Sequence, residues 1–73
     1  MIYISLIEAE NINLATEHDT FQGAIKAANY FVDASNDFGR VHSISVYETE
    51  TVVMGATRIK EQCKLTASIR TIR

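Results

Sequence analysis

The stretch DTFQGAIKAANYFVDAS, from Asp19 to Ser35, decides the fold. At about 100° per residue, a helix over these residues separates apolar from polar side chains. The apolar face consists of Phe21, Ala24, Ile25, Ala28, Phe31, Val32 and Ser35, and the opposite face of Gln22, Lys26, Asn29, Tyr30 and Asp33. A helix with one wide apolar face must cover another apolar layer. We therefore predict an amphipathic helix at about 19–36 that lies on a β-sheet.

The residues at both ends of this stretch suit helix boundaries. Asp19 is expected to cap the N-terminus, and Gln22, three residues later, to complete a capping box. Asn36 and Gly39 readily adopt the left-handed conformation of a C-terminal cap. Phe38 is then expected to fold back onto the end of the helix.

Strand patterns flank the helix. Residues 2–9 alternate two partly apolar faces and are rich in β-branched and aromatic side chains, which favours a central strand or an interface. Residues 13–17 are either a short strand or a connection. Residues 40–49 predict a strand with Ile44 and Val46 on one face beside His42, and with Ser43 and Ser45 on a face that sees solvent.

The C-terminal third has weaker patterns. Residues 51–58 are predicted to form a strand with a bulge at Gly55, and residues 59–62 a turn. Residues 65–72 alternate as a strand does, although Ile59, Cys63 and Thr66 also fit a helical spacing. The chain is thus expected to be one α+β domain over residues 1–73. It has a small antiparallel sheet of three or four strands, in the order β-α-β-β-β, with one helix on one face.

Composition limits what can stabilise so short a chain. It has 73 residues, 47% of them hydrophobic, and no proline, which is typical of an ordered globule. Domains of this size often depend on a disulfide, a metal or a partner. One cysteine excludes an internal disulfide, and His18, His42 and Cys63 are too scattered for a zinc signature. We predict no metal and no cofactor, which leaves oligomerisation or a well-packed core.

The N-terminal residues predict the compartment. Residues 1–7 are mostly apolar but stop at Glu8, without the basic region of a signal peptide. They fall far short of the roughly 20 apolar residues of a membrane span. The unpaired Cys63 agrees with a reducing compartment. We expect a cytoplasmic protein without membrane association.

Charge is divided along the chain, although the net charge is only −2. Residues 1–39 contain six acidic residues and one lysine, whereas residues 40–73 contain six basic and three acidic residues. The division indicates either a mixed surface or two faces of opposite sign, one of which docks on a partner.

Catalysis is not expected. We expect His18 and Asp19 to be a surface pair at the start of the helix. We expect His42 to be a hydrogen-bonded strand residue. Cys63 reads as a small, half-buried apolar side chain. The three glycines stand alone, so there is no phosphate-binding loop. We predict no catalytic residues and a protein that is not an enzyme.

Binding is the function class that the sequence favours. An open sheet edge can pair with another chain, and exposed tyrosines anchor interfaces. The predicted protein-binding residues are Tyr30, Lys26, Asp33, Tyr47, Glu48 and Glu50. A first alternative is nucleic-acid binding, less favoured because its basic stretch has no aromatic residue to stack on a base; its residues are Arg58, Lys60, Lys64, Arg70 and Arg73. A second alternative is a structural homo-oligomer, such as a homodimer.

In its size, β/α layout, lack of a catalytic constellation and divided charge, the chain is similar to small phage-encoded inhibitors. The resemblance implies an inhibitor that docks on a host protein or nucleoprotein complex, as anti-defence and anti-CRISPR proteins do. Acidic side chains would then imitate a phosphate backbone; these are Glu8, Glu10, Glu17, Asp19, Asp33, Asp37, Glu48 and Glu50.

Overall fold

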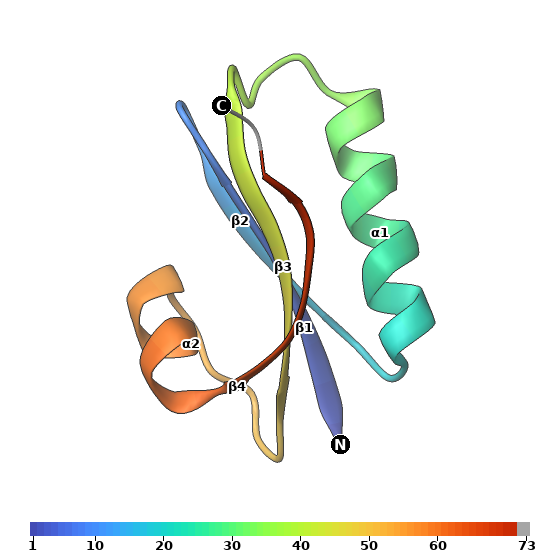
Figure 1. Cartoon of the computed structure of the whole chain (residues 1–73), viewed down its shortest axis with the longest axis vertical. Helices are drawn as coiled ribbons and strands as arrows, with labels where there is room; N and C mark the ends of the chain where they lie inside the picture. The colour runs from blue at the N-terminus through green and yellow to red at the C-terminus, as the bar shows by residue number, and fades with distance from the viewer. Residues whose placement is uncertain (72–73) are drawn as a thin grey trace.

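A four-stranded antiparallel sheet with a helix on each side forms the part of the chain that the computed structural model describes, residues 1–71, with side chains for residues 1–68 (Figure 1). The strand order is β2-β1-β3-β4. The α+β class, the antiparallel sheet and the packed helix are as predicted, but a second helix is present. In chain order the elements are β1 (Ile2–Ala9), β2 (Asn13–His18), α1 (Phe21–Ala34), β3 (Val41–Thr49), α2 (Ala56–Gln62) and β4 (Lys64–Thr71).

Strand β1 is the centre of the molecule because both of its faces are buried. Ile7 packs in a core cluster under α1, while Ile4 and Leu6 pack in a second cluster under α2. Ser5 is buried on the α1 side, and its Oγ donates a hydrogen bond to the Ala24 carbonyl at 3.0 Å. The central position predicted for residues 2–9 is therefore confirmed.

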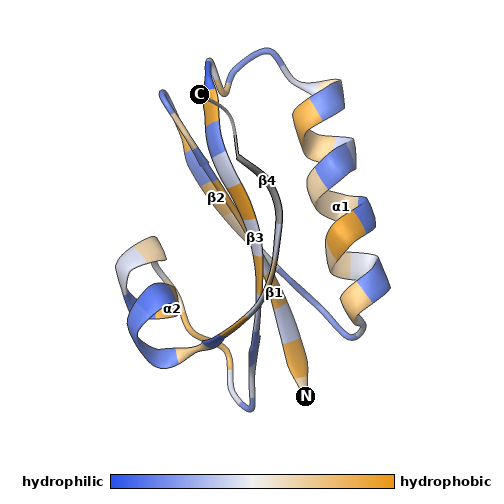
Figure 2. Ribbon diagram, viewed as in Figure 1, coloured by the Kyte–Doolittle hydropathy of each residue, from blue (hydrophilic) through white to orange (hydrophobic). Residues whose placement is uncertain are grey.

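The larger core lies between α1 and the sheet. Its buried residues are Ile7, Ala9, Ala28, Phe38, Val41 and Ile44, with Leu14, Phe31 and Val32 packed around them. Ala24 and Ala28 are fully buried, and their small side chains let the helix lie close to the strands. Apolar and polar residues alternate along α1 in Figure 2, as an amphipathic helix requires. Phe38 is buried after the helix end, as expected.

The second core corrects the prediction for the C-terminal third. Residues 51–58 are not a strand and residues 59–62 are not a turn: residues 51–55 are irregular, and α2 follows. Gly55, with a φ of +92°, begins the helix in a conformation that suits glycine. Ile59 is then fully buried against Ile4, Leu6 and Tyr47. The strand face predicted to see solvent is covered by α2, and Ser45 is buried on it.

The ends of α1 also differ from the prediction. Thr20, not Asp19, is the N-cap, because its Oγ1 accepts the Gly23 N–H at 2.9 Å. Gln22 therefore completes no capping box with Asp19. The helix ends at Ser35 in an extended conformation, so neither Asn36 nor Gly39 forms a left-handed cap.

Strand register explains the position of His42. The pairing of β1 with β3 shifts between Glu8 and Ala9, which face Ser43 and Val41 respectively. His42 falls in the bulge between these two pairs and is exposed, whereas Ile44 and Val46 are buried. Residues 13–17, left open by the sequence, belong to β2. The strand predicted over 65–72 is β4, apart from Ile72, which lies outside the described residues.

Replacing the observed cap tests the N-terminus of α1. Thr20→Ala removes the acceptor of the Gly23 N–H and is expected to lower the free energy of unfolding by about 1 kcal/mol. Asp19→Ala is the control and is expected to change it by under about 0.5 kcal/mol. Urea denaturation of the two variants decides between the caps, and a larger loss from Asp19→Ala would contradict the assignment.

Truncating Ile59 tests whether α2 closes a second core. Ile59→Ala should lower the free energy of unfolding by about 2–5 kcal/mol, because it removes a fully buried side chain between α2 and β1. The neighbouring exposed Arg58→Ala is the control and should be nearly neutral. A small effect of Ile59→Ala in urea denaturation would show that α2 does not hold this face of the sheet.

Candidate functional site

The two edge strands of the sheet differ in regularity. β4 pairs with β3 through two register shifts, which are the kind of irregularity that blunts an edge. β2 pairs with β1 over six consecutive residue pairs without a shift. No other described segment pairs with the outer side of β2. An edge strand of this kind presents unpaired backbone groups to another chain. β2 is therefore the better template for an added strand.

An apolar groove lies beside this edge, on the face of the sheet that α2 covers. Its hollow of about 140 Å³ is lined by Ile4, by residues 15–17 of β2 and by residues 52–55. Val52 is 52% exposed and Met54 is 75% exposed, so two large apolar side chains meet water where they line this hollow. The groove thus joins an open backbone edge to exposed apolar surface.

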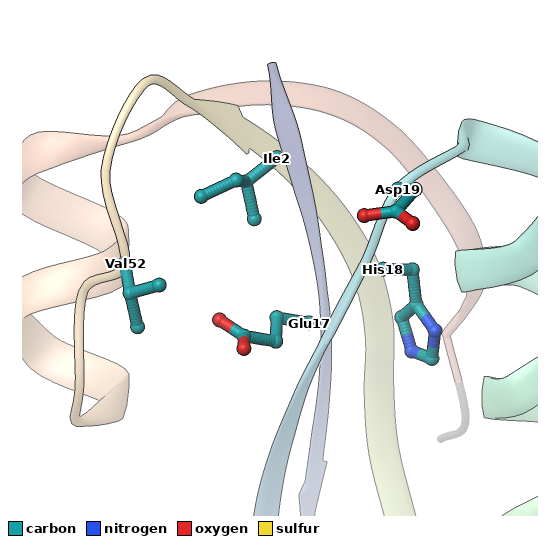
Figure 3. A pocket seen from close by; sticks show the side chains of 5 residues that line it. All are labelled: Ile2, Glu17, His18, Asp19 and Val52. Carbon is teal, nitrogen blue, oxygen red and sulfur yellow. The ribbon is translucent and has the colours of Figure 1, made fainter.

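A second hollow, of about 390 Å³, continues the groove towards the end of β2. It is lined by Ile2, Glu17, His18, Asp19 and Val52, and so shares Glu17 and Val52 with the first. Figure 3 shows the Glu17 side chain reaching from β2 towards Val52, with Ile2 beside them. His18 points to the other side of the strand, where its Nε2 lies 2.8 Å from Thr16 Oγ1. The hollow therefore combines apolar walls with carboxylates.

The predicted protein-binding residues are divided among different places. Tyr30, Lys26 and Asp33 are exposed on α1, and the Tyr30 ring meets that of Phe31 edge to face at 5.7 Å. Tyr47 is only 8% exposed because α2 covers it, so it is not on the open sheet face that the prediction assumed. Only the α1 residues form an exposed group.

The two predicted glutamates lie elsewhere. Glu48 is half-buried, and its Oε1 lies 3.7 Å from the Lys64 ammonium. Glu50 is exposed after β3 and lines a shallow hollow with Met1, Gln62 and Lys64. Neither residue lies at the groove beside β2.

The basic residues of the nucleic-acid alternative are partly neutralised within the chain. Lys60 pairs with Glu8 and Lys64 with Glu48. Arg58 is exposed on α2. Arg70 is opposite Ile44 in β4, where its side chain is not described, and Arg73 lies outside the described residues. Two of the five predicted phosphate ligands thus already have acidic partners.

The acidic side chains also differ in whether they already have a partner within the chain. Glu8 and Glu48 are the partners of the two lysines, and Glu10 accepts a hydrogen bond from the Arg40 N–H at 3.3 Å. The other five, Glu17, Asp19, Asp33, Asp37 and Glu50, have no ion-pair partner among the described residues, and of these Glu17 and Asp19 line the second hollow. These two carboxylates are the acidic groups best placed to meet a ligand.

Within residues 1–71, no group of three or more His, Cys, Asp and Glu side chains is arranged to hold a metal ion. Over the same part of the chain, no helix has the length and apolar character to cross a membrane. Comparison with known proteins gives no match to a family model, a curated protein or a solved structure. The candidate site therefore depends on geometry alone.

Sequence reasoning missed the residues that line the groove. Val52 and Met54 belonged to a predicted strand, where side chains alternate between faces and leave no groove. Ala15 lay in a segment that the sequence left open. The usable signal was the helical spacing of Ile59 and Cys63, because a helix there forces residues 51–55 into a connection.

The Lys60–Glu8 pair predicts a pH dependence of stability. The hydrogen bond that the Lys60 ammonium donates to the Glu8 carboxylate raises the pKa of Lys60 above its usual 10.5. Since the folded pKa is the higher one, the stabilisation is present at neutral pH and is lost as the pH rises through that folded pKa. Lys60→Met should cost under about 1 kcal/mol at pH 7, because the pair is partly exposed.

Urea denaturation of wild type and Lys60→Met at pH 7 and well above pH 10.5 measures this difference. The gap between the two proteins is expected to close at high pH. Lys26→Met is the control, since Lys26 has no ion pair among the described residues. A gap that stays constant with pH would contradict the assigned pair.

Proposed function

We propose that the protein acts without chemistry of its own, by binding an extended segment of another protein along β2 and in the groove beside it. The observation that carries the proposal is the position of Val52 and Met54. These exposed apolar side chains stand next to the one sheet edge, among the described residues, that runs without a register shift.

Backbone and side chains contribute differently to such binding. A segment that adds to β2 gains main-chain hydrogen bonds, which give affinity with little regard to sequence. Its side chains alternate between the two faces of the sheet, so every second one turns towards the groove. Covering Val52 and Met54 then removes apolar surface from water, which supplies the driving force.

The charge of the groove supports a protein ligand over a nucleic acid. Glu17 and Asp19 line the groove's second hollow, and among residues 1–68, whose side chains are described, no lysine or arginine lines either hollow. Phosphates would be repelled at this place. Lys60 and Lys64, which the alternative requires, are held by Glu8 and Glu48.

A different protein fits the edge better than a second copy. A two-fold pairing of β2 with itself about an axis normal to the sheet, centred on Ala15 or Thr16, sets Glu17 opposite Asn13 or Ala15. In neither case does the carboxylate gain a cation. A partner that brings a positive charge is complementary to the groove, whereas a second copy adds two more acidic side chains.

Binding of this kind has a direct consequence for the partner. A segment held on β2 is unavailable to any other strand or surface with which it pairs. A protein without catalytic groups can inhibit a larger assembly in this way, as the resemblance to small phage-encoded inhibitors implies.

Capture from a lysate of the cells in which the protein occurs tests the proposal when surface variants are compared. The double variant Val52→Ser/Met54→Ser should lose its partner, with an affinity at least about tenfold weaker, because central apolar anchors carry most binding energy. Tyr30→Ser is the matched control, since it removes a side chain that is 67% exposed from the helix on the opposite face.

The expected result is one partner that survives nuclease treatment, is kept by Tyr30→Ser and is lost by the double variant. Loss with Tyr30→Ser alone would move the interface to the outer face of α1. Material captured only without nuclease would support the nucleic-acid alternative.

A further inference from the structure

The groove is shaped to receive a single apolar side chain opposite Ala15. On a strand added to β2, the residue facing Ala15 lies on the same side of the sheet as the groove. Ala15 has no side chain beyond Cβ, so it leaves space between the edge and residues 52–54. The hollow of about 140 Å³ is close to the cavity of about 150 Å³ that accepts benzene in another protein. One branched aliphatic side chain fills such a volume.

The next position on the same face of the added strand meets Glu17. It lies two residues away, which is about 6.8 Å along a strand. Glu17 has no ion pair among the described residues, and its side chain reaches into the hollow that Ile2 and Val52 wall. A lysine or arginine suits this hollow because its aliphatic stem packs on apolar walls while its charged end meets the carboxylates of Glu17 and Asp19.

The direction of the added strand fixes the order of these two residues. All three pairings in the sheet are antiparallel, and antiparallel ladders are slightly more stable per residue. In an antiparallel segment, the residue opposite Glu17 comes before the residue opposite Ala15. Resting on the proposed function, we infer that the ligand is an extended peptide segment with a basic residue, any residue, and then an aliphatic residue.

Peptide binding measured by fluorescence polarisation tests this order and this charge. The probe is a fluorescein-labelled peptide of sequence STKTLTS. It is compared with STLTKTS, which has the same composition in the reverse order, and with STETLTS, which carries an acidic residue in place of lysine. Wild type should bind the first peptide about fivefold more tightly than either of the others.

A charge exchange makes the test specific for Glu17. Glu17→Lys should weaken STKTLTS about fivefold and strengthen STETLTS by a similar factor. Both effects are expected without loss of folding, because Glu17 is exposed. The matched control is Glu61→Lys, an equal charge change on α2 at a residue that lines neither hollow.

The outcomes separate this inference from the proposed function. Equal binding of all three peptides, lost only in Val52→Ser/Met54→Ser, would overturn the inferred ligand and leave the docking surface standing. No binding of any peptide up to about 1 mM, while the captured partner is still lost by that double variant, would likewise overturn the inferred ligand. A captured partner that every groove variant keeps would overturn the proposed function itself. A concentration-dependent dimer that Glu17→Lys stabilises would show that the occupant is a second copy.

Discussion

The structure depends on the burial of β1 from both sides. Ile4 and Leu6 on one face, and Ser5 and Ile7 on the other, are almost fully excluded from water. A single helix covers only one face of a sheet, so a strand of this composition requires a second layer. The chain supplies α1 for one face and the shorter α2, with residues 51–55, for the other. In a chain of 73 residues, neither layer alone would bury enough apolar surface.

The unequal size of the two layers creates the groove. α2 has seven residues against the fourteen of α1, and its one fully buried side chain, Ile59, lies over the middle of the sheet. The cover thins out towards β2, where Ala15 and Glu17 stay exposed. The connection that leads into α2 leaves Val52 and Met54 at this margin. The proposed binding surface therefore follows from the way in which the second face of β1 is covered.

Periodicity predicted the parts of the fold that are long enough to show it. Four turns of helix in α1 and the two apolar faces of β1 are evident in the sequence, and the structure confirms both. The choice between Asp19 and Thr20 as the cap was not accessible, because both residue types cap helices and only side-chain geometry separates them. α2 was missed because two turns give little periodic signal, and Val52 and Val53 favour a strand by propensity. The burial of Ile59 against Leu6 outweighs the strand preference of these two valines.

The candidate site was less accessible from sequence than the fold. An open sheet edge was foreseen, but which edge stays regular depends on the bulges of β4, and those follow from its register against β3. The exposure of Tyr47 was wrongly predicted for the same reason as α2, since the helix that buries it was not recognised. The division of charge along the chain did not indicate where on the folded protein a binding site would lie. Glu17 and Asp19, the acidic groups of the proposed site, are distinguished from the other carboxylates by the hollow that they line.

Amide hydrogen exchange of the chain, alone and saturated with its captured partner, tests most directly whether β2 is the binding edge. Exchange reports hydrogen bonding residue by residue, and an added strand must protect the outward amides of the strand it joins. We expect slower exchange on binding within Asn13–His18, with β4 unchanged. Protection confined to β4 or to the outer face of α1, with no change in β2, would contradict the account.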